Sequence, residues 1–123
     1  MGLTYVTVKI VPLEGESGKK QSYEDNFLVD TGATDTMVPA DKLEATGLQS
    51  KGKMVFELAD GRLEEYKYGV AQIEFMGEIT AGRVIFGPPG SEPLLGVTAL
   101  ESVGILVDPV NKTLKRLPAI PLK

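Results

Sequence analysis

The chain has 123 residues and a formal net charge of −4, and this length suffices for a single domain, residues 1–123, with its own core. It contains no cysteine and no histidine, which excludes disulfides, thiolate or histidine metal sites and the Ser-His and Cys-His catalytic arrangements. Carboxylates are the main acid–base groups left, and the acidic balance argues against nucleic acid as a partner. We therefore expect no metal and no cofactor.

Membrane insertion and secretion are also disfavoured by the sequence. No apolar run approaches the roughly 20 residues that a membrane span needs. The N-terminal stretch MGLTYVTVKIV lacks the charged start and the small-residue cleavage site of a signal peptide. These features predict a cytoplasmic protein without a membrane partner.

The first half of the chain has the pattern of an all-β domain, because apolar residues recur mostly with strand period between Gly, Pro and charged turns. A first strand is predicted over about residues 4–13, followed by the polar loop EGESGKKQS at 14–22. A second strand over 23–29 ends on Asp30. After Pro39, the stretch ADKLEATG predicts one or two helical turns that stop at Gly47.

The second half continues with hairpins. The stretch KMVFELADGRLEEYKY predicts a long hairpin with a type I′ turn at Asp60-Gly61, and a further hairpin is predicted over 70–86 with its turn at 76–78. The loop GPPGSEP can continue neither a ladder nor a helix. LLGVTALESVG then predicts a short helix that ends at Gly104, and ILVDPVNKTLKRL a strand, an Asp-Pro turn and a last strand.

The stretch FLVDTGAT, residues 27–34, holds the candidate for chemistry. Asp30 follows a strand whose apolar residues enter the core, so its carboxylate lies at the edge of low-dielectric surroundings, which is costly unless the charge is used or paired. A plain structural interpretation is a strand-ending turn, in which Asp30 bonds the backbone two residues on and Gly32 supplies a positive φ.

The context of this tripeptide gives it a second interpretation. A hairpin follows it, and then the unit Leu94-Leu95-Gly96 leads into the short helix. In FLVDTGAT, in the Asp60-Gly61 hairpin and in LLGVTALESVGILVD, the sequence resembles the retropepsin-like aspartic proteases, the single-domain relatives of pepsin. The resemblance runs from about residue 4 to 108. It implies an all-β, pepsin-like closed β-barrel with a flap hairpin and one short helix.

The resemblance also implies a role for each matching residue. Asp30 is similar to the catalytic aspartate, Thr31 to the threonine whose hydroxyl ties two catalytic loops together, and Gly32 to the glycine that lets backbone approach the aspartate and the peptide. Leu94, Leu95 and Gly96 would form the crossing that supports the catalytic loop. The implied substrate-binding residues are Ala33, Asp60, Gly61, Leu95 and Val97.

Two departures separate this chain from the retroviral members of the family. Those members carry an aspartate in the catalytic loop that pairs with an arginine after the later glycine, whereas Thr34 and Val97 stand at the matching positions here. The hairpin ELADGRLEEY also lacks a glycine-rich tip. The chain is therefore closer to the cellular and bacterial relatives of the fold.

Aspartic proteolysis needs two carboxylates that share one proton, and this chain has one Asp-Thr-Gly. The sequence therefore predicts a homodimer that hydrolyses a peptide or protein substrate, with one Asp30 from each subunit. A non-catalytic β-barrel that serves dimerisation or peptide binding is the alternative. A singly protonated pair predicts a bell-shaped pH profile of activity on the acid side of neutrality.

Overall fold

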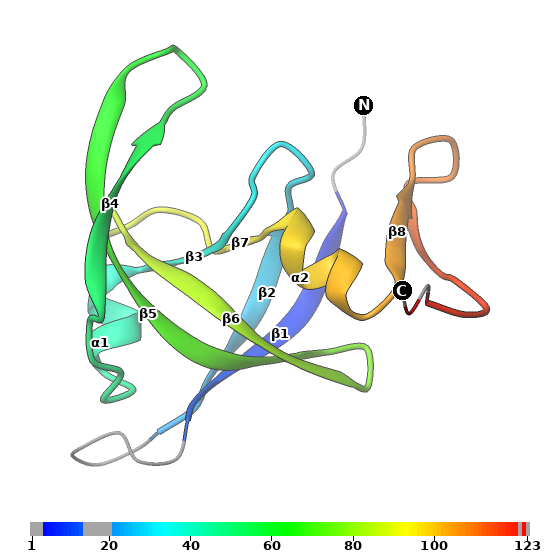
Figure 1. Cartoon of the computed structure of the whole chain (residues 1–123), viewed down its shortest axis with the longest axis horizontal. Helices are drawn as coiled ribbons and strands as arrows, with labels where there is room; N and C mark the ends of the chain where they lie inside the picture. The colour runs from blue at the N-terminus through cyan, green and yellow to red at the C-terminus, as the bar shows by residue number, and fades with distance from the viewer. Residues whose placement is uncertain (1–3, 14–20, 121, 123) are drawn as a thin grey trace.

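The computed structural model describes residues 4–13, 21–120 and 122, so most of the predicted loop at 14–22 lies outside the described residues. Strands dominate the described chain and confirm the all-β class (Figure 1). The elements in chain order are β1 Tyr5–Pro12, β2 Tyr23–Val29, β3 Thr36–Pro39, α1 Ala40–Glu44, β4 Gly52–Glu57, β5 Leu63–Phe75, β6 Glu78–Gly87, β7 Leu94–Leu95, α2 Val97–Ser102, β8 Ile105–Asp108 and β9 Thr113–Arg116.

Seven strands form one sheet in the order β1-β2-β7-β3-β6-β5-β4. Because β1 pairs with β5 as well as with β2, the pairings of six strands run in a ring, and β4 adds to β5 outside it. The shortest strand of the ring is β7, with two residues. Its Leu94 and Leu95 pair with β2 in parallel, and Leu94 faces Met37 of β3. This arrangement agrees with the predicted pepsin-like fold.

The core fills the inside of this ring. Alternate residues of β1 and β5 point inward, as the strand period predicts, and Val8, Ile10, Phe27 and Ile73 are each exposed by 2% or less. Helix α2 adds Leu100, and the following strand β8 adds Ile105. Burial of this apolar set supplies the main driving force for the fold, at about 25 cal/mol per Å² of apolar surface.

The two predicted hairpins share one strand, because β5 is continuous for 13 residues and pairs with both β4 and β6. The predicted type I′ turn at Asp60-Gly61 is wrong: Gly61 has a positive φ of 87°, but Asp60 does not. The Gly61 N–H donates to Leu58 O and the Leu58 N–H to Arg62 O, which defines a three-residue loop. A two-residue turn with both φ values positive lies instead between β5 and β6, at Met76-Gly77.

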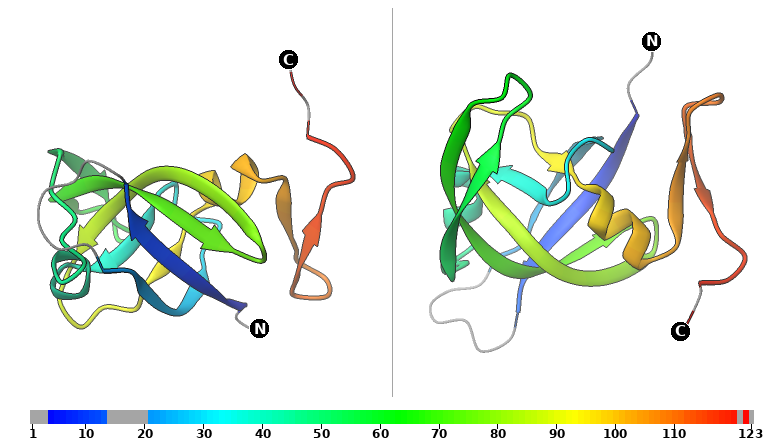
Figure 2. Two further views of the ribbon diagram at one scale, coloured as in Figure 1. Left: turned by 90° about the horizontal axis from the view of Figure 1, so that it is seen from below. Right: turned by 45° about the horizontal axis from the view of Figure 1, so that its top comes forward.

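The C-terminal part of the chain forms a second sheet of two strands that packs against the core. Helix α2 is followed by Gly104, whose φ is 72°, and β8 and β9 pair only with each other, beside the main sheet (Figure 2). The predicted strand, turn and strand are confirmed. Hydrogen bonds from Asn111 and from the Val110 N–H stabilise the turn and lower the pKa of the Asp108 carboxyl that accepts them.

The two helices that the structure describes span five and six residues, so neither is long enough to cross a lipid bilayer.

Candidate active site

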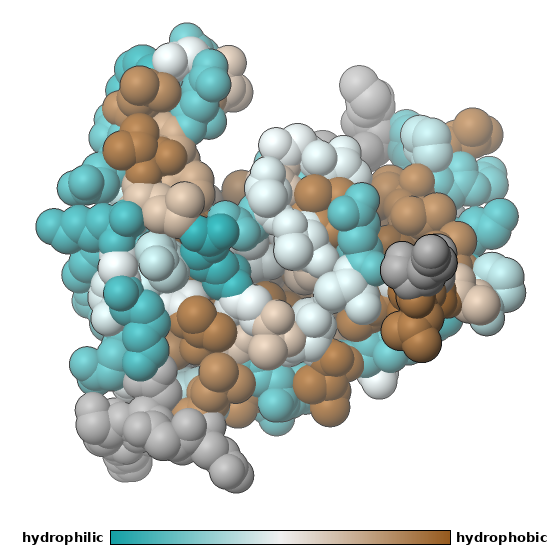
Figure 3. Space-filling view, viewed as in Figure 1, coloured by the Kyte–Doolittle hydropathy of each residue, from teal (hydrophilic) through white to brown (hydrophobic). Residues whose placement is uncertain are grey.

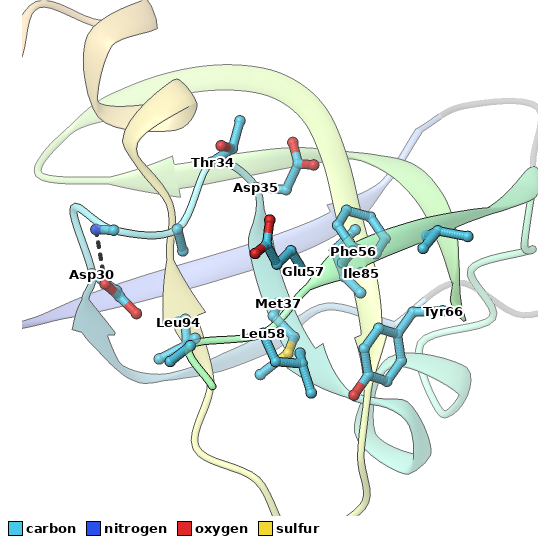
Figure 4. Close-up of a pocket in the computed structure, with 14 residues that line it drawn as sticks. Asp30, Thr34, Asp35, Met37, Phe56, Glu57, Leu58, Tyr66, Ile85 and Leu94 are labelled. Carbon is cyan, nitrogen blue, oxygen red and sulfur yellow. Dashed lines mark hydrogen bonds between the residues drawn. The ribbon is translucent and has the colours of Figure 1, made fainter. Parts of the chain in front are cut away.

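Asp30 is the first residue of the loop between β2 and β3. It directly follows Val29, where the pairing of β2 with β7 ends. Its backbone N–H donates to Leu95 O at 3.1 Å, and its carbonyl accepts from the Ala33 N–H at 3.1 Å. The Gly32 N–H donates to Asp30 Oδ1 at 2.9 Å (Figure 4). The half-buried carboxylate is therefore fixed both by the main chain of β7 and by its own loop.

Position 32 needs a glycine because a side chain there would crowd Asp30. Its φ is not positive, so the turn does not need the left-handed conformation that the plain structural interpretation supposed. A Cβ atom at this position would lie 3.3 Å from Asp30 Oδ1, which is closer than most real contacts. The Asp30 side chain thus lies directly against the Gly32 backbone, and a larger residue would displace it.

The loop between β2 and β3, residues 30–35, which we call the Asp30 loop, is joined to the start of α2 by backbone hydrogen bonds. The Val97 N–H donates to Ala33 O at 2.8 Å, and the Thr98 N–H donates to Thr34 O at 3.1 Å. The buried Thr36 hydroxyl accepts from the Gly96 N–H at 3.2 Å. Two backbone hydrogen bonds and the Thr36 hydroxyl therefore link these two segments.

A cleft of about 660 Å³ opens beside Asp30. One wall comes from the Asp30 loop and the sheet. The opposite wall comes from the hairpin of β4 and the first half of β5, residues 52–68, which we call the flap hairpin. Figure 3 shows the hollow between this hairpin and the body of the molecule, with apolar side chains on the hairpin. The lining residues are Asp30, Gly32, Ala33, Thr34, Asp35, Met37, Val55, Phe56, Glu57, Leu58, Ala59, Tyr66, Ile85 and Leu94.

The predicted site residues take different places around this cleft. Asp30, Gly32 and Ala33 line it, while Thr31 is exposed on the loop between them. Asp60 and Gly61 lie at the exposed tip of the flap hairpin and do not line the cleft in a single chain.

The residues around β7 divide by their exposure. Leu95 is fully buried in the core, and Leu94 lines the cleft in its place. Val97 is half-buried at the start of α2, outside the cleft lining of a single chain.

Several cleft residues had no role in the sequence analysis. Tyr66 could have been found from the strand period, since Glu64, Tyr66 and Tyr68 alternate with exposed residues along β5. Asp35 and Glu57 carry no comparable signal. They reach the cleft because the Asp30 loop and the flap hairpin approach each other from distant parts of the sequence (Figure 4).

The two further cleft carboxylates differ in their surroundings. The side chain of Asp35 is only 13% exposed, and its Oδ2 lies 3.6 Å from Nε of Arg83. Glu57 is exposed on β4. Among the described residues, no three acidic side chains gather closely enough to hold a metal ion.

The fold is pepsin-like and mostly β. It carries an Asp-Thr-Gly loop supported by a crossing strand, and a hairpin lies over the cleft. These features define an aspartic-protease-type domain. Residues 18–102 match the model of the family described as gag-polyprotein putative aspartyl protease. Because the match covers well over half of the chain, the protein belongs to this family of retropepsin-like aspartyl protease domains. No curated protein matches the sequence.

Proposed function

We propose that the protein is a homodimeric aspartic endopeptidase in which Asp30 of each subunit contributes one carboxyl group. One carboxylate accepts a proton from a water molecule as that water attacks the scissile carbonyl carbon, and the protonated partner donates to the amide as the C–N bond breaks. The observation that carries this proposal is the position of Asp30 at the cleft opposite the flap hairpin. Gly32 binds Oδ1, and Oδ2 accepts no hydrogen bond from the described residues.

A second copy is needed because each chain supplies one Asp-Thr-Gly. Asp35 is paired with Arg83, and Glu57 belongs to the flap hairpin, so neither carboxylate has the setting of Asp30. The Thr31 side chain is exposed, and its hydroxyl makes no hydrogen bond within the described chain. A hydroxyl in this position is available to the matching loop of a partner.

The C-terminal hairpin offers a surface beside Asp30 for such a partner. Its strands β8 and β9 have no neighbours other than each other among the described strands, and Leu106 is 44% exposed. Thr4 connects this hairpin to β2, the strand that precedes Asp30. Its carbonyl accepts a hydrogen bond from the Val29 N–H at 2.8 Å, and its hydroxyl donates to Lys112 O at 3.1 Å. Unpaired strand edges of this kind accept strands from another chain.

The cleft suits an extended peptide with apolar side chains near the scissile bond. Its walls are largely apolar, with Met37, Ile85 and Leu94 on the body and Phe56 and Tyr66 on the flap hairpin. Extended peptides bind between β elements because their main chain forms hydrogen bonds while alternate side chains enter pockets. We therefore expect cleavage in unfolded or loosely structured segments.

Replacing Asp30 by Asn tests the chemistry, because it keeps the shape of the side chain and removes the acid. We expect the D30N variant to lose turnover of a denatured protein substrate at acidic pH and to retain the oligomeric state of the wild type. A non-catalytic module would bind the same peptides equally well with either residue. Unchanged turnover in D30N would overturn the proposal.

Mixing the two proteins tests whether both subunits supply an aspartate. If subunits exchange at random, adding an equal amount of D30N to a fixed amount of wild type should reduce activity to about half, and a threefold excess to about a quarter, because mixed dimers hold one carboxylate. An enzyme that acts as a single chain would keep its full activity in both mixtures.

A further inference from the structure

Arg83 of β6 lies where the base of the flap hairpin meets the Asp30 loop. Its Nε lies 3.6 Å from Asp35 Oδ2, and its Cζ lies 5.1 Å from the centre of the Tyr68 ring. Nη1 also contacts the sulfur of Met54 on β4. One half-buried cation thus touches both strands of the hairpin and the wall of the cleft.

On the hairpin side, Tyr68 is held in place by close packing. Gly52 and Tyr68 are direct partners across β4 and β5, and a Cβ atom at position 52 would lie 3.0 Å from the Tyr68 hydroxyl oxygen. The ring therefore lies against the backbone of Gly52 and also faces the Arg83 guanidinium. A planar guanidinium over an aromatic ring gives an attractive and oriented contact.

On the cleft side, Asp35 is part of a rigid segment. Its backbone packs against Gly96, where a Cβ would lie 2.6 Å from Asp35 O. The preceding residues Ala33 and Thr34 are bound to the start of α2. Because the Asp35 carboxylate is largely withdrawn from water, it needs a cation, and Arg83 is the cation that pairs with it in the described chain.

We propose that Arg83 is a positioning residue that sets the flap hairpin relative to the Asp30 loop. This inference rests on the proposed function, since it assigns the hairpin a role in holding the substrate. Loss of the guanidinium would free Tyr68 and Met54 at the hairpin base and leave Asp35 without its cation at the cleft wall. Asp30 itself would keep its contacts with Gly32 and Leu95, so substrate binding would suffer more than the chemical step.

The test compares Arg83→Met, which keeps much of the stem and removes the charge, with Arg83→Lys, which keeps the charge. Lys9→Met is the control, because it also removes one positive charge, and Lys9 lies on β1, outside the cleft lining and the flap hairpin. We expect R83M to raise KM about fivefold with kcat changed less than about twofold, a size typical of coupled contacts. R83K should recover part of the loss, and K9M should match the wild type.

A second measurement does not depend on catalysis. Hydrogen exchange of the amides in the flap hairpin should be faster in R83M than in the wild type or K9M, because the hairpin base is released. If the wild type cleaves no peptide, the proposed function fails, while this exchange pattern still supports the positioning role. Unchanged exchange in R83M would overturn that role, as would equal effects on KM and on exchange in K9M.

The double variant R83M/D35N checks that the two residues act through each other. Removing both charges leaves no unpaired carboxylate in the cleft wall, so KM should be no worse than in R83M alone. Fully additive effects would contradict the proposed link. Should R83M fail to fold, R83K and D35N decide the question by the same two readouts: normal KM and normal exchange in both variants would overturn the proposal.

Discussion

Gly96 lies directly against the peptide group of Asp35: a Cβ atom at position 96 would lie 2.5 Å from the Asp35 carbonyl carbon. The φ of Gly96 is −84° and its ψ 167°, which any residue adopts, so the glycine is required by space alone. This contact lets the turn between β7 and α2 meet the Asp30 loop. The hydrogen bonds from Val97 and Thr98 to that loop form directly next to this contact.

We expect Gly96→Ala to destabilise the protein, because the added methyl group meets backbone atoms that cannot move without breaking these hydrogen bonds. Overpacking of this kind costs about 1–3 kcal/mol. Denaturant unfolding measures the change. Gly82→Ala is the control, because a Cβ there meets nothing within 4 Å and the φ of Gly82 is not positive. Equal stability of G96A and G82A would contradict the steric argument.

Local sequence patterns predicted the strands well, because each strand carries its own alternation of apolar and polar residues. The segment 23–29 is an example: it ends before Asp30, as the change from apolar to polar residues indicates. The turns were less predictable. Both Asp60-Gly61 and Met76-Gly77 could form a two-residue turn. The pairing register of β5 with each of its neighbours determines which of the two turns has this type.

The cleft could be predicted only in part. Asp30, Gly32 and Ala33 are adjacent in the chain and form a recognisable unit, whereas Asp35 and Tyr66 meet at the cleft through tertiary packing. The sequence analysis expected Leu95 to bind the substrate, whereas Leu94 lines the cleft and Leu95 is buried. Tertiary packing decides this difference as well. β7 is two residues long and alternates its side chains, so one of the pair enters the core and its neighbour faces the cleft.

The proposed pair of Asp30 carboxyls predicts how activity depends on pH. Catalysis needs one protonated and one ionised member, because one accepts a proton while the other donates one. Activity should therefore follow a bell-shaped curve with its maximum on the acid side of neutrality. Measurement of kcat/KM for one peptide from about pH 3 to pH 8 tests this. A rate that rises steadily through alkaline pH would contradict the shared proton.

Tyr23 predicts a change in stability at alkaline pH. Burial against the core and the hydrogen bond that its hydroxyl donates to Asp25 Oδ2, at 2.9 Å, raise the pKa of Tyr23 to about 12. Its ring also lies 6.1 Å from that of the core residue Phe27. The folded protein therefore holds this proton more tightly than an unfolded chain, in which tyrosine has a pKa near 10.

The sign follows from proton linkage. Below about pH 10 both states are protonated and the stabilisation from Tyr23 is complete, whereas it is lost as the pH rises from about 10 through about 12, because the unfolded chain releases its proton first. Tyr23→Phe removes this ionisation. We expect the urea midpoint of the wild type to fall more between pH 8 and 11 than that of Y23F. An equal fall in both proteins would show that the Tyr23 hydroxyl does not contribute to alkaline unfolding.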